Sequence, residues 1–302
     1  MEKVLVLMST YNGESYLDEQ LNSIFNQEGV DVDLYIRDDG STDKTLDIIR
    51  NWQKKGNINF YQGENLRPAK SFMNLISNSG GYKYYALSDQ DDFWKKNKLI
   101  TALSAIKEKN NTEPTLYYSM STITDEKLQK LDKSDIEKKY TFAESLVRNN
   151  AQGATMVFND SMIELIKSHI PLQLDMHDSW IYSVAKGVGA NIIYDYDSYM
   201  YYRQHNNNVI GKGEKDVGLF KKIKRKLTLT HENKGLRYEN VIEMYKGYYN
   251  FMSPQDKKVL LKVLNYKKNI ITKIMVVTDT DINTGSILRK ISFAYDIFFE
   301  LF

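Results

Sequence analysis

Between Lys3 and Lys107 the chain alternates short apolar segments with longer segments whose apolar residues recur at helical spacing. The short segments are typical of buried strands, and the longer ones of helices that bury one face. The predicted strands are Lys3–Met8, Val32–Ile36, Ile58–Tyr61 and Tyr82–Leu87, and the predicted helices include Glu14–Asn26, Arg67–Ser77 and Lys95–Lys107. This alternation predicts an α/β fold with a mostly parallel sheet flanked by helices.

From Thr115 onward the alternation is less regular. Further strands are predicted at Leu116–Met120, Asn191–Tyr194 and Tyr199–Tyr202, with a polar excursion from Thr122 to Leu131. Short helices are predicted at Phe142–Val147, Ser161–Ser168 and Ser179–Lys186. Beyond Asp216 the spacing of apolar residues predicts helices alone, in four or five segments.

The composition is that of an ordinary globular protein, with 42% apolar and 26% charged residues. The absence of cysteine excludes disulfides, thiolate metal sites and a cysteine nucleophile. The apolar run at the N-terminus is too short for a signal peptide, and no run is long enough to span a bilayer. We therefore expect a cytoplasmic location.

Charge is distributed unevenly along the chain. The segment from Lys215 to Phe302 carries 17 basic and 9 acidic residues, whereas the rest carries 24 basic and 30 acidic residues. An acidic N-terminal body joined to a basic C-terminal part indicates two functional regions.

An acidic turn, Ser88–Trp94, follows the predicted strand Tyr82–Leu87 and contains Asp89, Asp91 and Asp92. Open α/β sheets bind ligands at the carboxyl ends of their strands, where this turn is expected to lie. A pair of carboxylates suits a divalent cation that also takes oxygens from a substrate diphosphate. The alternative is a solvated turn that caps the helix beginning near Lys95.

Polar side chains also follow other predicted strands, in the motifs "LMSTYNG", "RDDGSTDKT", "SDQDDFW", "MHDSW" and "YRQHNNNVIG". In this order and spacing, between Lys3 and Gly211, the motifs resemble those of the family 2 glycosyltransferases, inverting sugar transferases with the GT-A fold. They are most similar to bacterial rhamnosyltransferase-like members that build cell-surface polysaccharides. Each motif alone is weak evidence, but five in order are strong evidence.

The resemblance implies a GT-A catalytic domain at residues 1–212, with a nucleotide-sugar half at 1–120 and an acceptor half at 121–212. It implies transfer of a sugar, first L-rhamnose from dTDP-rhamnose, to a saccharide hydroxyl. A donor of the UDP-hexose or UDP-N-acetylhexosamine type is the second choice. Alternatives of another class are a metal-dependent nucleotide phosphatase and a sugar-nucleotide-binding subunit without activity.

The resemblance assigns nucleotide-sugar binding to a set of polar residues in these motifs. They are Thr10, Tyr11, Asn12, Asp38, Asp39, Lys70, Asp89, Gln90 and Arg203. Either Asp38 or Asp39 is expected to accept a hydrogen bond from the base, while the other stabilises the turn; the resemblance slightly favours Asp39 for the base. The family frequently has Gly where Arg67 stands, which leaves the backbone near Lys70 open. Lys70 has the alternative of an exposed helical lysine.

By the same resemblance, Asp91 and His205 are expected to bind Mn²⁺ or Mg²⁺, and Asp178 is the expected base that deprotonates the acceptor hydroxyl. The acceptor side is expected to include Asp92, Trp94, Gln152, Gly153 and His177. Other interpretations stay open: Asp178 as the N-cap of its helix, Asp92 as a helix cap, and His205 as a structural loop histidine.

The basic region 213–302 contains a lysine-rich run at 221–227 and a last segment, Ile287–Phe302, with Ile291, Ala294, Tyr295, Phe298, Phe299 and Phe302 at helical spacings. Such a segment suits the anionic inner surface of the cell membrane, where a lipid-linked acceptor would be found. It equally suits packing against the catalytic domain or a second subunit. No nucleic-acid motif is visible, so a nucleic acid partner is not expected.

Overall fold

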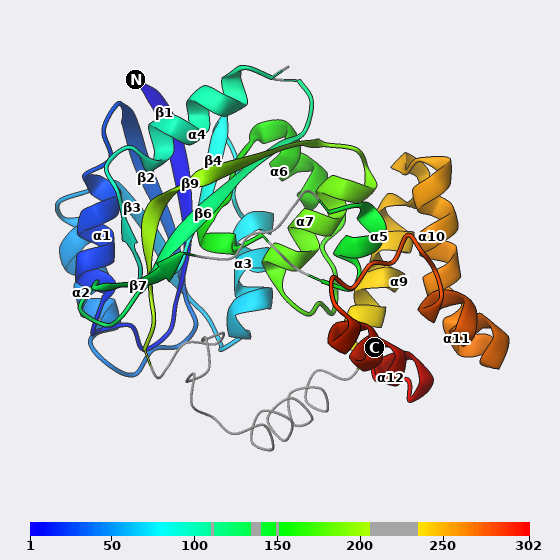
Figure 1. The fold of residues 1–302 in the computed structure, drawn as a ribbon. Helices are drawn as coiled ribbons and strands as arrows, with labels where there is room; N and C mark the ends of the chain where they lie inside the picture. Colours follow the sequence, from blue (N-terminus) through cyan, green and yellow to red (C-terminus); the bar gives the residue numbers. More distant parts are fainter. Residues whose placement is uncertain (110–111, 134–139, 149–150, 206–234) are drawn as a thin grey trace. The chain divides into compact units, whose positions relative to one another are not determined.

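The computed structural model of the protein describes residues 1–109, 112–133, 140–148, 151–205 and 235–302 (Figure 1). The chain forms two compact units, each built from several segments. The first unit comprises Met1–Glu137, Asn150–Ile170 and Ala190–Asn208, and the second Lys138–Asn149, Pro171–Gly189 and Val209–Phe302. The predicted domain boundary at 212/213 lies outside the described residues and stays a prediction.

The first unit is built on one sheet, and its strands in chain order are β1 (Glu2–Thr10), β2 (Val30–Asp38), β3 (Ile58–Gln62), β4 (Tyr84–Ser88), β5 (Phe93–Trp94), β6 (Thr115–Thr124), β7 (Lys130–Lys133), β8 (Val157–Asn159) and β9 (Asn191–Arg203). Their spatial order is β3-β2-β1-β4-β8-β6-β9-β5, with β7 paired to β6. The first four are mutually parallel, as are β6 and β9, and the remaining pairs are antiparallel. The prediction of a mostly parallel sheet is confirmed.

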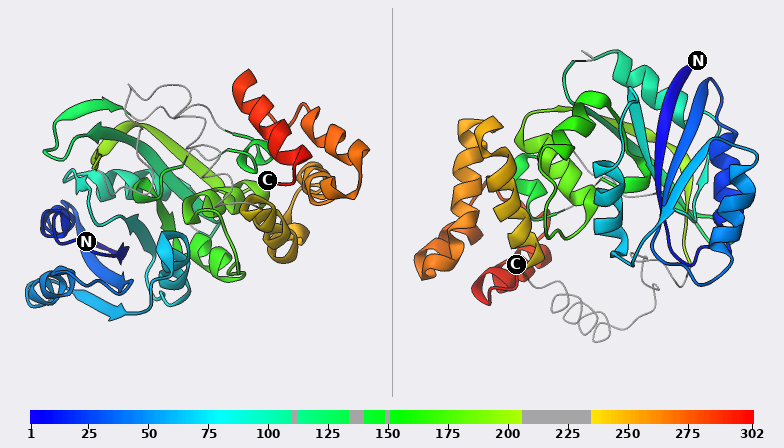
Figure 2. Two further views of the ribbon diagram at one scale, coloured as in Figure 1. Left: turned by 90° about the horizontal axis from the view of Figure 1, so that it is seen from below. Right: turned by 180° about the vertical axis from the view of Figure 1, so that it is seen from behind.

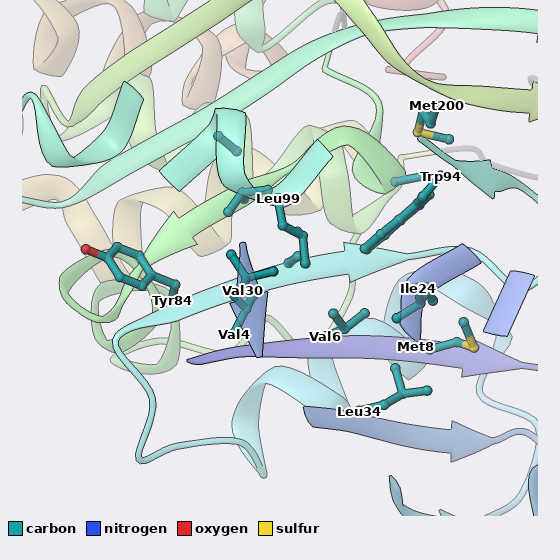
Figure 3. Packing of buried hydrophobic residues seen from close by; sticks show 14 of the residues in the cluster. Val4, Val6, Met8, Ile24, Val30, Leu34, Tyr84, Trp94, Leu99 and Met200 are labelled. Carbon is teal, nitrogen blue, oxygen red and sulfur yellow. The ribbon is translucent and has the colours of Figure 1, made fainter. Parts of the chain in front are cut away.

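Helices cover both faces of this sheet, and they are α1 (Leu17–Phe25), α2 (Thr45–Gln53), α3 (Arg67–Ser77), α4 (Lys98–Lys107) and α6 (Asp160–Lys167). The alternation of β1 explains the two layers, because successive strand side chains point to opposite faces. Val6 and Met8 belong to one buried cluster that also contains Ile24 of α1, Trp94 of β5 and Leu99 of α4 (Figure 3). α3 contacts β1, β2 and α6, with its own buried apolar residues such as Phe72 and Ile76.

The two strands predicted at Asn191–Tyr194 and Tyr199–Tyr202 are one continuous strand, β9. Its polar middle stays in the sheet because β6 pairs along it, with shifts of register near Met120. The Tyr117 hydroxyl also donates a 2.9 Å hydrogen bond to Asp195 of that polar stretch. Likewise β6 extends to Thr124, past the end predicted for it, and β7 replaces part of the predicted excursion.

The second unit is helical, and its described α-helices are α5 (Phe142–Ser145), α7 (His177–Gly187), α9 (Leu236–Tyr248), α10 (Pro254–Leu264), α11 (Ile270–Val277) and α12 (Ile287–Phe298) (Figure 2). The prediction of a helical C-terminal region is confirmed for residues 235–302, while the lysine-rich run at 221–227 lies outside the described residues. α10 begins in the expected way, with the Ser253 side chain capping the Asp256 N–H and Pro254 at the first helical position. Across the described parts of the chain, we find no helix with the length and apolar character required to cross a membrane.

Candidate active site

The predicted nucleotide-sugar residues of the first unit gather at one edge of its sheet. Strands β2, β1 and β4 are parallel neighbours, so the loops that follow Asp38, Thr10 and Ser88 emerge side by side. The fourth segment is the end of β9 at Arg203, which is tied by hydrogen bonds to the acidic turn after β4. The sheet order therefore brings together segments that lie far apart in the sequence.

The loop after β1 is held by the side chain of Gln90. The Gln90 Oε1 accepts a 2.9 Å hydrogen bond from the Tyr11 N–H, and its Nε2 donates a 3.0 Å bond to the Tyr11 carbonyl. A Cβ at Gly13 would lie 2.3 Å from Gln90 Oε1, so a side chain there would displace the Gln90 amide from its present position. The Tyr11 ring remains 47% exposed, which leaves it accessible for stacking on a base.

The backbone of this loop turns at Asn12, which has a positive φ of 47°. Asparagine tolerates this left-handed conformation better than most residues. Its N–H donates to Ser41 Oγ at 2.9 Å, and its side-chain oxygen accepts from the Thr42 N–H at 2.9 Å. These bonds fasten the loop after β1 to the loop after β2.

Asp38 is fully buried and stabilises the turn. One of its oxygens accepts from the N–H groups of Gly40 and Ser41, and the other from the hydroxyls of Thr10 and Ser41 at 3.0 and 2.5 Å. The φ of Gly40, +84°, is a conformation that side-chain-bearing residues rarely adopt. These bonds hold the turn together, and the nucleotide-sugar role predicted for Asp38 stays a prediction.

Asp39 is 2% exposed and is engaged differently. It forms an ion pair with Arg37 and accepts a hydrogen bond from the Leu66 N–H at 3.1 Å. The next residue, Arg67, has a positive φ of 63°, which explains why glycine is frequent there in the resembling family. Lys70 lies half-buried in the first turns of α3. The roles predicted for Asp39 and Lys70 stay predictions.

Asp91 and His205 lie far apart in the sequence but are in contact in the structure. The His205 Nε2 lies 2.8 Å from Asp91 Oδ2, and the two side chains are 8% and 17% exposed respectively. Asp89 and Gln90, in the same turn, are half-buried. This arrangement places a carboxylate and an imidazole together at the edge where ligands bind.

This pair fits a hard divalent cation that completes its shell with water and diphosphate oxygens. Carboxylate oxygen and imidazole nitrogen are both suitable ligands for Mn²⁺. Among the residues that the structure describes, no group of three or more acidic or histidine side chains is arranged to hold a metal ion. Any ion held by Asp91 and His205 would take further ligands from water and from the substrate.

Asp92 and Trp94 lie beneath this edge, in the interior. Both are at most 1% exposed, and Asp92 Oδ1 accepts a 3.2 Å hydrogen bond from the Arg203 N–H. The helix-cap alternative for Asp92 is wrong, because α4 begins at Lys98 and its N-cap is Asn97. The acceptor-side roles of Asp92 and Trp94 stay predictions, and their burial favours a structural one.

Burial also shifts the protonation equilibria of this interior. It raises the pKa of Asp92 well above its usual range, and the neighbouring carboxylates of Asp91 and Asp89 act in the same direction. Burial lowers the pKa of Lys98 to about 7, against the opposing effect of Asp92. The Lys98 ammonium lies 3.8 Å from the centroid of the Trp94 ring, where a cation–π interaction compensates part of its lost hydration.

Arg203 is 2% exposed, and its guanidinium is directed at protein groups. Its Nε donates to the Asp91 carbonyl at 2.9 Å, while the two terminal nitrogens donate to the Glu126 carbonyl and the Glu19 carboxylate. Its predicted place among the nucleotide-sugar ligands stays a prediction. Gln152, beside Gly153, accepts a 2.7 Å hydrogen bond from the Ser121 hydroxyl, and the acceptor-side roles of both residues also stay predictions.

His177 and Asp178 belong to the second unit, in the first turn of α7. Both side chains are buried, and Asp178 Oδ1 accepts from the Ser179 N–H at 2.6 Å. The N-cap alternative for Asp178 is wrong, because the cap is Met176 and the helix begins at His177, two residues before the predicted start. Burial lowers the pKa of His177 to about 3, so the imidazole is neutral at physiological pH.

Sequence reasoning missed Tyr16, Glu19 and Lys98. Tyr16 contacts both the Arg203 guanidinium, 4.7 Å from its ring centroid, and the His205 ring, with centroids 4.9 Å apart. Nothing in the local sequence distinguishes these residues from the exposed face of an amphipathic helix. Lys98 in particular follows Lys95, Lys96 and Asn97, a polar run that gives no sign of its burial.

Comparison with known proteins shows the family of this chain. Residues 5–169 match the protein family described as "Glycosyl transferase family 2". The chain is 30% identical over 220 residues to the dTDP-rhamnosyl transferase RfbG of Shigella flexneri, covering 68% of this chain and 73% of that protein.

Two solved structures are similar in fold. Residues 1–349 of S. aureus TarS, in complex with UDP-GlcNAc, align with a TM-score of 0.59 and 16% identity, covering 100% of this chain and 82% of that one. The mannosyltransferase PcManGT from Pyrobaculum calidifontis, in complex with GDP-Man and Mn²⁺, aligns with a TM-score of 0.54 and 16% identity, covering 99% and 80%. Together with the sheet and its flanking helices, these matches confirm the predicted GT-A fold, and the chain belongs to glycosyl transferase family 2.

Proposed function

We propose that this glycosyltransferase moves L-rhamnose from dTDP-rhamnose to a saccharide hydroxyl, with inversion, in the synthesis of a surface polysaccharide. The observation that carries the proposal is the pairing of Asp91 with His205 at 2.8 Å, at the same sheet edge as the exposed Tyr11 ring. The similarity to a dTDP-rhamnosyl transferase supports the choice of donor. A UDP-hexose or UDP-N-acetylhexosamine is the second candidate.

In this proposal the Tyr11 ring stacks on the base, Asp39 contributes to its recognition, and Asp89 contacts the ribose. Asp91 and His205 hold Mn²⁺ or Mg²⁺, and the ion would neutralise charge on the leaving diphosphate. Asp178 removes the proton of the acceptor hydroxyl as the hydroxyl attacks the anomeric carbon from the face opposite the diphosphate. A single displacement of this kind inverts the anomeric configuration.

The base assignment is tested by Asp178→Asn, compared with Asp47→Asn at an exposed carboxylate on α2. We expect Asp178→Asn to lose sugar transfer by about a hundredfold or more while donor affinity stays within about twofold. Release of phosphate from the donor or from simple nucleotides without an acceptor, unchanged in Asp178→Asn, would instead favour the phosphatase alternative. Donor binding without transfer to any saccharide in the unsubstituted protein would favour the non-catalytic subunit.

We further propose that an exposed C-terminal apolar surface binds an anionic membrane. Large apolar side chains are exposed on α11 and α12, which contact each other. They are Ile270, Ile271, Ile274, Met275, Ile287, Ile291, Tyr295, Phe298 and Phe299. Exposed basic residues, Lys268, Arg289 and Lys290, lie near the ends of these helices. Apolar side chains bordered by basic ones suit the interface of an anionic bilayer.

Sedimentation with lipid vesicles tests this surface. We expect more protein to sediment with vesicles that contain phosphatidylglycerol than with phosphatidylcholine alone. Ile291→Glu with Phe298→Glu should abolish this binding, and Tyr196→Glu, at an exposed apolar residue of the first unit, should not. If the unsubstituted protein ignores both vesicles but dimerises, and the double variant is a monomer, the surface is instead a subunit interface.

A further inference from the structure

Arg203 is a hub between four segments of the first unit. Its side chain reaches the acidic turn, through the Asp91 carbonyl, and α1, through the Glu19 carboxylate. It also reaches the loop after β6 through the Glu126 carbonyl, and its own main-chain N–H donates to buried Asp92. The guanidinium is thus held by the protein from several directions, in the fork geometry that arginine provides.

The same hub borders the two proposed metal ligands. Asp91 receives the Arg203 Nε on its main-chain oxygen, while its carboxylate meets His205, two residues after Arg203. The Tyr16 ring lies against both the guanidinium and the His205 imidazole. Arg203 therefore contacts Asp91 directly, and it contacts His205 through the Tyr16 ring.

We propose that Arg203 is a positioning residue, which together with Glu19 and Tyr16 fixes the Asp91–His205 pair in the geometry that the donor complex requires. The inference rests on the proposed function for the identity of that complex. It differs from a direct contact between Arg203 and the diphosphate, because the guanidinium is buried and already donates to three protein acceptors. Mutation of groups that orient metal ligands without touching the metal commonly lowers metal affinity by about 10- to 100-fold.

Glu19→Gln separates the two roles, because Glu19 contacts Arg203 and its side chain is 46% exposed. Loss of the carboxylate leaves a buried guanidinium without its charged partner and loosens the hub. A positioning role predicts that the Mn²⁺ concentration for half-maximal donor binding rises about tenfold or more in Glu19→Gln. A direct role in binding phosphate predicts unchanged or tighter donor binding, because the guanidinium would be released toward the ligand.

Amide hydrogen exchange of the ligand-free protein gives a readout independent of the donor. We expect Glu19→Gln and Arg203→Lys to accelerate exchange in peptides covering residues 89–92 about tenfold or more. The control is Arg50→Met, which removes an exposed arginine paired with Asp47 on α2. Exchange within twofold of the unsubstituted protein in both hub variants would overturn the proposal.

The two proposals fail separately in this design. If the unsubstituted protein binds no nucleotide sugar, the proposed function fails, while the exchange measurement still decides whether Arg203 orders the acidic turn. If donor binds but Glu19→Gln leaves its Mn²⁺ dependence unchanged, Arg203 is not a positioning residue for this site. Arg203→Met is less informative, because it could unfold the first unit; Glu19→Gln retains size and a hydrogen-bonding side chain.

Discussion

The neutral histidine beside the proposed base makes the second unit sensitive to acid. His177 is buried, and its pKa is lowered to about 3 from a value of 6.5. Between these two values the unfolded chain binds a proton that the folded protein does not, so the free energy of unfolding falls as the pH drops below 6.5. At about 1.4 kcal/mol per pH unit, this group alone removes about 2 kcal/mol of stability between pH 8 and pH 5.

Replacement of His177 by leucine removes the titrating group and keeps the site apolar. We expect His177→Leu to lose about 2 kcal/mol less than the unsubstituted protein over the same pH range. Urea unfolding is best followed by the fluorine signal of a fluorotryptophan at Trp180, which lies in the same helix, α7. The control is His169→Gln, in the first unit.

The reasoning would be refuted by equal losses in His177→Leu and the unsubstituted protein. It would also be refuted by an NMR titration in which the folded His177 ring gains its proton near pH 6.5. His169→Gln should retain the pH dependence of the unsubstituted protein, because His177 is unchanged in it.

Three further predictions concern the first unit. Gln90→Ala removes both bonds to the Tyr11 main chain. At a cost of about 1 kcal/mol per bond, we expect donor affinity, measured by calorimetry, to fall about thirtyfold; unchanged affinity would contradict this. Arg67→Gly relieves a left-handed φ of 63° and should raise the free energy of urea unfolding by up to about 1 kcal/mol, whereas Lys44→Gly, at a φ of −79°, should not raise it. The unfolded lysine keeps its proton up to pH 10.5, whereas burial makes the folded Lys98 lose it near pH 7. The free energy of unfolding should therefore rise by about 1.4 kcal/mol per pH unit above pH 7. Lys98→Met should remove this rise, and an unchanged slope would contradict the prediction.

Strand–helix alternation was sufficient to predict the parallel core of the first unit. Apolar strands and amphipathic helices there follow one another with short loops, so local pattern and tertiary structure agree. The apolar pattern did not predict β9 as one strand, because the polar residues in its middle indicate a break between two strands. Pairing with β6 decides that case, and pairing is not visible in a local window.

The last helix shows a second limit of periodicity. The sequence marked Ile291, Tyr295 and Phe298 as one apolar face, but these side chains are exposed, while Phe293 and Ile297 are buried. The segment is apolar on both faces, so helical spacing alone does not tell which one packs inward.

In the candidate site, too, the sequence motifs located some residues, while the roles of others depend on tertiary contacts. Motifs placed Asp91, His205 and Tyr11 at strand ends, and the sheet order then brings the segments that carry them to one edge. Gln90, Asp38 and Glu19 act through hydrogen bonds to other parts of the first unit. No motif specifies these bonds, because most of them join residues distant in sequence.

The central claim, a donor site built on the Asp91–His205 pair, is tested most directly by calorimetry with and without Mn²⁺. The donors to compare are dTDP-rhamnose, UDP-glucose, UDP-galactose, UDP-N-acetylglucosamine and GDP-mannose, with Asp91→Ala and the exposed-site control Asp47→Ala. The account predicts Mn²⁺-dependent binding of dTDP-rhamnose, lost in Asp91→Ala and retained in Asp47→Ala. Absence of binding by every donor under both metal conditions, or binding that survives Asp91→Ala unchanged, would contradict it.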